Sequence, residues 1–93
     1  MLVRRIHLVV SGRVQGVGFR AYTQQAAIEN DIVGWVRNLA DGAVEVEAVG
    51  EDKQVDQFIK KVKKGPSFFA KVKNIEVTEC ETVHNYQKFE IVY

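Results

Sequence analysis

A glycine-rich stretch near the start of the chain, "SGRVQGVGFR" at residues 11–20, contains residue types that bind anions. Gly12, Gly16 and Gly18 allow the backbone to turn its amide N–H groups toward one point, and the missing Cβ lets an anion approach closely. Arg20 follows in the first turn of a predicted helix, where a cation opposes the helix dipole unless an anion is bound there. The stretch therefore indicates a cradle for a phosphate-sized anion, gripped by the side chain best shaped to donate two hydrogen bonds.

The residues of this stretch alone also fit less specific interpretations. A loop with flexible glycines and a solvated surface arginine has the same composition. The run "GVGFRA" also fits the loose dinucleotide-binding pattern, but the chain is too short for the doubly wound fold that carries it. No Lys-Ser or Lys-Thr follows the glycines, so the stretch is not the phosphate loop of nucleoside triphosphate-binding proteins.

Asn38 is the second candidate for chemistry, because of where the predicted strands end. The strands at residues 6–10 and 32–37 are joined by a crossover helix and should run parallel, so their ends share one edge of the sheet. Asn38 should therefore lie near Arg20. An asparagine side chain both donates and accepts hydrogen bonds, so it can hold a water molecule without acting as a base. A turn-forming role before "LADG" accounts for Asn38 equally well.

Hydrophobic periodicity predicts the elements that must position these side chains. Alternation predicts strands and helical spacing predicts helices, in the order strand 6–10, helix 19–30, strands 32–37 and 43–49, helix 52–64, strand 71–80 and a final strand from residue 89. Val72 is out of phase with Ile75 and Val77, which predicts a bulge or an offset start. The order is typical of a ferredoxin-like α+β fold, β-α-β-β-α-β, with an antiparallel sheet, two helices on one face and a short extra C-terminal strand. Glu45 and Glu47 are expected to face water on the other side.

Composition narrows the class of protein. With 93 residues the chain is one domain, residues 1–93, and its 46% hydrophobic and 27% charged residues are ordinary for a soluble globular protein. A net charge of +1 argues against a nucleic-acid partner. The lone Cys80 excludes an internal disulfide, and no apolar run approaches the roughly 20 residues that a membrane helix needs. We therefore expect a cytoplasmic monomer with neither a membrane nor a nucleic-acid partner.

Several further side chains are expected to have structural roles. Phe19, Tyr22 and Trp35 are expected to pack in or around the core, with the substrate approach as the alternative for Trp35. Cys80 lies in a predicted strand and is interpreted as an inert thiol. The lysines of "KKVKK" at residues 60–64 complement the dipole at the end of the second helix and stay solvated.

Two long motifs resemble the signatures of the acylphosphatase family. The run "VSGRVQGVGFR" at residues 10–20 is similar to the first signature, and "GWVRNLADGAVEVEAVG" at residues 34–50 is similar to the second. The resemblance covers the whole chain, down to "GPSFFAKV" after the second helix. It implies a small ferredoxin-like enzyme that hydrolyses the carboxyl-phosphate bond of acylphosphates, with a small-molecule substrate and no metal, organic cofactor or covalent phosphoenzyme.

The same resemblance implies a role for each site residue. Arg20 would bind the phosphate together with loop amides, and Asn38 would orient the attacking water. The amides are those of Gln15, Gly16, Val17, Gly18 and Phe19. A dedicated base is hard to find, because His7 lies near the wrong edge of the sheet and His84 lies in a predicted hairpin loop. The resemblance implies instead that the substrate phosphate itself accepts the water proton.

Two functions of other classes compete with this interpretation. An RNA-binding module with the same element order needs aromatic side chains on the open face of its third strand, where this chain has Glu45 and Glu47. A regulatory domain that holds a phosphorylated metabolite without turning it over stays open, because Arg20 and Asn38 suit binding as well as catalysis.

Overall fold

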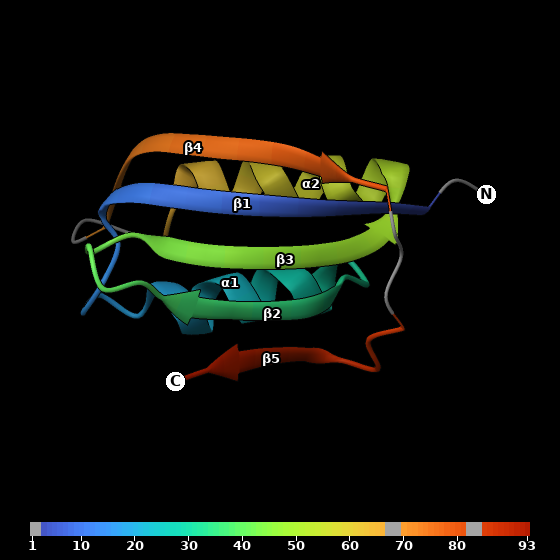
Figure 1. Ribbon diagram of the computed structural model, residues 1–93, viewed down its shortest axis with the longest axis horizontal. Helices are drawn as coiled ribbons and strands as arrows, with labels where there is room; N and C mark the ends of the chain where they lie inside the picture. Colours follow the sequence, from blue (N-terminus) through green and yellow to red (C-terminus); the bar gives the residue numbers. More distant parts are fainter. Residues whose placement is uncertain (1–2, 67–69, 82–84) are drawn as a thin grey trace.

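The computed structural model describes residues 3–66, 70–81 and 85–93. Within these ranges five strands form one sheet in the order β4-β1-β3-β2-β5, and both helices cover the same face of it (Figure 1). The elements are β1 (Val3–Arg13), α1 (Phe19–Glu29), β2 (Val33–Asn38), β3 (Val44–Glu51), α2 (Asp52–Lys64), β4 (Lys71–Cys80) and β5 (Phe89–Val92). The predicted ferredoxin-like order with an additional C-terminal strand is confirmed.

The direction of β5 makes the sheet mixed. As expected, β1 pairs antiparallel with β3 and β4, and β2 pairs antiparallel with β3. By contrast, β5 pairs parallel with β2. Figure 1 shows the reason: β5 begins at the edge of the sheet where β4 ends, so it runs opposite to β4. As a consequence β1, β2 and β5 all end at one edge, which is also the edge where α1 begins.

The core lies between the sheet and the two helices. Alternate residues of β1 and β3 point toward the helices, and α2 packs against them with a stripe at helical spacing. Each fully buried aliphatic or aromatic side chain contributes about 1.5–3 kcal/mol by leaving water. The side chains that these three elements bury completely are Ile6, Leu8, Val10, Val44, Val46, Ala48, Val55, Phe58 and Val62.

A bulge in β4 explains the out-of-phase position of Val72. Ser11 pairs with Asn74 but the next residue, Gly12, pairs with Val72, so Lys73 is the extra residue on β4. The backbone of β4 comes so near that a Cβ on Gly12 would lie 2.1 Å from the carbonyl oxygen of Lys71. Only glycine fits at this position, which is where β1 approaches the glycine-rich loop.

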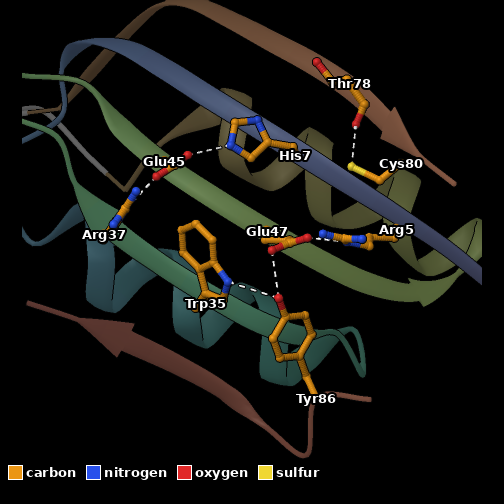
Figure 2. Close-up of polar contacts among 9 residues, drawn as sticks. All are labelled: Arg5, His7, Trp35, Arg37, Glu45, Glu47, Thr78, Cys80 and Tyr86. Carbon is orange, nitrogen blue, oxygen red and sulfur yellow. Dashed lines mark hydrogen bonds and ion pairs between the residues drawn. The ribbon is translucent and has the colours of Figure 1, made fainter. Parts of the chain in front are cut away.

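The prediction that Glu45 and Glu47 face water is wrong. Both side chains lie on the open face of the sheet, but Glu47 is only 6% exposed and Glu45 is largely covered. Glu47 accepts hydrogen bonds from Arg5 and from the Tyr86 hydroxyl at 2.7 Å (Figure 2). Strand alternation identifies the face of the sheet, but it does not reveal that long side chains from other elements fold over that face.

Trp35 also differs from expectation. Its strand neighbours Gly34 and Val36 are buried on the helix side, so the indole lies on the open face, outside the core. Its Nε1 donates to the Tyr86 hydroxyl at 3.2 Å (Figure 2). Phe19, by contrast, is in the core as predicted, and the hydroxyl of Tyr22 donates to the carbonyl of Lys61 beside it.

Candidate active site

A pocket of about 170 Å³ lies at the edge of the sheet where β1, β2 and β5 end. The glycine-rich loop, the first turn of α1, the end of β2 and the end of β5 form its walls. Its lining residues are Val14, Gly16, Gly18, Phe19, Arg20, Ala21, Asn38, Ile91 and Tyr93. The structure therefore brings Arg20 and Asn38 together, as the parallel direction of β1 and β2 indicated.

The glycine-rich loop leaves the start of α1 uncapped. Gly16 and Gly18 have φ angles of 74° and 77°, in the left-handed region that favours glycine, and a Cβ on either would meet nothing within 4 Å. Gly18 is the N-cap residue, no side chain caps the helix, and its first turn has no acidic residue. The N–H of Tyr22 makes a 3.0 Å bond to the Gly18 carbonyl, so the amides of residues 19–21 have no intrahelical acceptor. This end of α1 therefore carries the partial positive charge that attracts an anion.

Arg20 lies at the mouth of this cradle without an anionic partner. Its side chain is half-buried, and it forms neither a hydrogen bond nor an ion pair with any residue that the structure describes. It stacks instead on an aromatic ring, with the guanidinium carbon 4.7 Å from the ring centroid of Tyr93. All five donors of the guanidinium are left to a ligand.

Asn38 is the last residue of β2, opposite Val44 on β3. Its side-chain Oδ1 is buried and accepts no hydrogen bond from the described part of the chain. Leaving such an oxygen unsatisfied costs about 1–3 kcal/mol, so an unpaired amide in a polar pocket indicates a place for a donor. The hydroxyl oxygen of Thr23 is also buried and unpaired, but Thr23 does not line the pocket.

The side chain of Gln15 connects the glycine-rich loop to the turn between β2 and β3. Its Nε2 donates to the carbonyl oxygens of Leu39 and Ala43, each at 2.8 Å. The predicted turn between β2 and β3 is closed by Leu39 and Ala43 themselves, through a 2.8 Å bond from the Leu39 N–H to the Ala43 carbonyl. Gln15 thus ties the glycine-rich loop to the turn that follows Asn38. The sequence predicted only its backbone amide as a functional group.

The remaining predicted site residues divide into two groups. Gly16, Gly18 and Phe19 line the pocket, whereas Gln15 and Val17 do not, and Val17 packs against the core. Sequence reasoning missed four lining residues, which are Val14, Ala21, Ile91 and Tyr93. Alternation in the sequence indicates that Ile91 and Tyr93 share one face of the final strand, but only the parallel pairing of β5 with β2 brings that strand to end beside Asn38.

His7, the histidine that the structure describes, supplies no base in the pocket. His7 lies in the middle of β1, and its Nε2 is 2.7 Å from Glu45 Oε2 on the open face (Figure 2). His84 lies outside the described residues. Among those that are described, no group of three His, Cys, Asp or Glu side chains gathers where it could hold a metal. Over the same residue ranges, no helix has the length and apolar character needed to cross a membrane.

Comparison with known proteins identifies close relatives. The Acylphosphatase family model matches residues 6–91. A curated acylphosphatase from Oceanobacillus iheyensis is 56% identical over 91 residues, which cover 98% of this chain and 100% of that protein. The crystal structure of an acylphosphatase from Bacillus subtilis superposes with a TM-score of 0.93 at 41% identity, covering 99% of this chain and 100% of that one. An acylphosphatase structure from Coxiella burnetii gives a TM-score of 0.91 at 37% identity, with 97% and 93% covered.

Proposed function

Because this chain belongs to the acylphosphatase family, it is an enzyme of acylphosphate hydrolysis, and we propose that the pocket at the end of β1, β2 and β5 is its active site. One observation carries the proposal: two groups without a hydrogen-bonding partner among the described residues lie in the same pocket. They are the guanidinium of Arg20 and the buried Oδ1 of Asn38. On the open face of the sheet, by contrast, Arg5 is paired with Glu47, and both His7 and Arg37 are paired with Glu45.

Arg20 and the loop amides hold the phosphate in this proposal. The uncapped start of α1 offers backbone N–H groups and a partial positive charge, and the guanidinium adds two parallel hydrogen bonds to the phosphate oxygens. The amides involved are those of Gln15, Gly16, Val17, Gly18 and Phe19. A bound phosphate also neutralises the unfavourable placement of Arg20 in the first turn of the helix.

Asn38 orients the attacking water. Its unpaired Oδ1 accepts a hydrogen bond from a water molecule, whose lone pair then faces the phosphorus. The oxygen of that water forms a bond to phosphorus, the bond from phosphorus to the bridging oxygen breaks, and the carboxylate leaves with the electron pair. An acylphosphate is an activated mixed anhydride with a good carboxylate leaving group, so positioning and charge stabilisation can supply most of the catalysis.

The proton of the attacking water passes to the substrate phosphate in this scheme. No side-chain carboxylate or imidazole is found among the described residues that line the pocket. A rate that depends steeply on pH near the ordinary histidine pKa of about 6.5, and that loses this dependence in His84→Ala, would contradict this assignment.

We also propose that the enzyme acts without a metal, as a cytoplasmic monomer. The pocket residues that the structure describes bear no carboxylate, thiolate or imidazole ligand for a metal. Cys80 is a free thiol, which suits a reducing compartment. The large hydrophobic side chains that are exposed among the described residues, such as Val3 on β1, Ile28 on α1 and Val77 on β4, come from separate elements and not from one apolar stripe.

The decisive experiment measures release of benzoate and phosphate from benzoyl phosphate, with a chelator present, for the wild type and for Asn38→Ala. We expect kcat to fall about 10²- to 10³-fold in Asn38→Ala, because one preorganised polar group is lost from the transition state. Competitive inhibition by inorganic phosphate should be retained. Asn74→Ala, at an exposed position on β4, is the matched control and should leave kcat unchanged.

The same assay separates catalysis from binding. A folded wild-type protein that binds phosphate but releases no benzoate would overturn the proposal. The chain would then be a domain that holds a phosphorylated ligand without hydrolysing it.

A further inference from the structure

Tyr93 occupies an unusual position at the pocket. It follows β5 in phase with Ile91, so both side chains lie on the same face of that strand, and both line the pocket. Its ring centroid is 4.7 Å from the guanidinium carbon of Arg20. Yet Tyr93 is 95% exposed to solvent. A large aromatic side chain thus lies beside the proposed phosphate-binding group with nearly all of its surface still wet.

Core packing does not account for this ring. Another aromatic residue of the same strand, Phe89, is 4% exposed and lies edge-on against Phe58, with 6.0 Å between the ring centroids. Phe89 therefore stabilises the fold by leaving water, whereas Tyr93 gains almost nothing in this way. An exposed aromatic ring at the rim of a small polar pocket is suited to cover an apolar part of a ligand instead.

The connectivity of an acylphosphate brings its acyl group to this ring. With the phosphate held by Arg20 and the loop amides, the acyl carbon is only one bridging oxygen away from phosphorus. The pocket wall formed by β5 is apolar at Ile91 and aromatic at Tyr93, whereas the walls near Gly16 and Asn38 are polar. Two aromatic residues are found among the described residues that line the pocket, and Phe19 is buried in the core. An acyl group that is directed along β5 therefore meets the exposed ring of Tyr93.

We propose that Tyr93, with Ile91 behind it, forms an acyl-group subsite that makes the enzyme prefer acylphosphates with an aromatic acyl group. The inference rests on the proposed function of the pocket and names the class of substrate that it selects. An aromatic acyl group stacks against the free face of the Tyr93 ring, while a small aliphatic group such as acetyl makes little contact with it. The preference arises from the ring and does not require the hydroxyl.

The test compares benzoyl phosphate with acetyl phosphate in the wild type, Tyr93→Ala and Tyr93→Phe. We expect the ratio of the two kcat/KM values, benzoyl over acetyl, to fall about 3- to 10-fold in Tyr93→Ala and to stay near the wild-type ratio in Tyr93→Phe. The inhibition constant of inorganic phosphate should not change. Val92→Ala is the matched control, because Val92 lies on the opposite face of the same strand beside Trp35 and Arg37, and it should leave the ratio unchanged.

Two results would overturn the subsite. If Tyr93→Ala slows both substrates equally and weakens inhibition by phosphate, the ring only positions Arg20 through their stacking contact. If Tyr93→Ala changes neither substrate, the ring has no role in selection. Both results leave the proposed hydrolysis intact, since the wild type is active in each.

A binding measurement keeps the inference testable even if the wild type is inactive. Phenacylphosphonate and acetonylphosphonate carry a methylene group in place of the bridging oxygen and cannot be hydrolysed at that bond. Calorimetry should show that the phenacyl compound binds about 3- to 10-fold more tightly, and that Tyr93→Ala removes the difference. Equal affinities in the wild type would overturn the subsite. Discrimination without turnover would support the subsite and contradict the proposed hydrolysis.

Discussion

Two regions of this small protein treat polar side chains in opposite ways. On the open face of the sheet, Arg5 is paired with Glu47, and Glu45 lies between His7 and Arg37 (Figure 2). In the pocket at the edge of the same sheet, Arg20 and Asn38 have no hydrogen-bonding partner among the described residues. Both regions use half-buried arginine and oxygen acceptors, so composition alone does not distinguish them.

The difference distinguishes polar side chains that stabilise the fold from polar side chains that are available to a ligand. A paired group stabilises the fold, and removing one partner leaves the other buried and uncompensated. An unpaired group does not stabilise the fold, and where it is buried it costs free energy, but it is available to a ligand or a transition state. Substitutions on the open face should therefore lower the free energy of unfolding and leave turnover unchanged. Substitutions in the pocket should slow turnover and leave stability nearly unchanged.

The largest expected effect is that of Arg20→Ala. Loss of the guanidinium removes a bidentate contact to phosphate, so kcat/KM should fall about 10³-fold or more. The melting temperature should change little, because Arg20 pairs with no acidic side chain among the described residues and stacks only on the exposed Tyr93. Steady-state kinetics and thermal unfolding of the same sample check both parts. A large loss of stability with normal turnover would reverse the distinction between the two regions.

Substitution of Glu47 should give the opposite result and is next in size. Glu47 is 6% exposed and accepts hydrogen bonds from Arg5 and Tyr86. Removing the carboxylate in Glu47→Ala leaves the guanidinium of Arg5 without this anion, and the free energy of unfolding should fall by about 3 kcal/mol. Urea denaturation at neutral pH measures it. Turnover per folded molecule should stay within about two-fold of the wild type.

Glu47→Gln is the matched control for that experiment. It keeps the size of the side chain and an acceptor oxygen for Tyr86 but removes the charge. If Glu47→Gln loses less stability than Glu47→Ala, the difference between the two losses comes from the polar groups that only the alanine variant leaves unpaired. If both variants unfold like the wild type, the open face does not contribute to stability in the manner described.

Local patterns were enough to predict the elements of the fold. The helix at Asp52–Lys64 has one apolar stripe, begins after Glu51 and ends before Gly65, and its predicted bounds are those observed. The out-of-phase Val72 indicated either a bulge or an offset start, and the structure shows the bulge in β4. The predicted proximity of Arg20 and Asn38 followed from strand direction alone, and the pocket contains both. These features depend on neighbours in sequence or on simple topology.

The features that were missed depend on side chains from distant parts of the chain. Nothing in the alternation of β3 reveals that Tyr86, 39 positions after Glu47, donates to its carboxylate. The role of the Gln15 side chain likewise depends on carbonyl oxygens 24 and 28 positions away. Tyr93 was recognised as part of a strand, but its contact with Arg20 requires β5 to run parallel to β2. Such contacts follow from the assembled fold and not from local spacing.

The smallest expected effect concerns pH and Glu45. Burial raises the pKa of this carboxyl group, but hydrogen bonds from His7 and Arg37 lower it by more, so the net pKa lies below its ordinary value of 4.5. A lowered pKa in the folded state means that the unfolded chain binds the proton more readily. The contribution of Glu45 to stability is therefore complete above about pH 4.5 and is lost as the pH falls through the folded-state pKa.

Unfolding free energies from about pH 6 down to about pH 3 measure this contribution, which we expect to be no more than about 1 kcal/mol because Arg37 is half exposed. Glu45→Gln should weaken the acid dependence in proportion, while Glu76→Gln, an exposed carboxylate on β4, should leave it unchanged. Turnover per folded molecule should not change in Glu45→Gln, because Glu45 does not line the pocket. The opposite result would be a fall of kcat at acid pH in the wild type that disappears in Glu45→Gln. It would mean that a charge paired on the open face affects the reaction in the pocket, and it would contradict the distinction between the two regions.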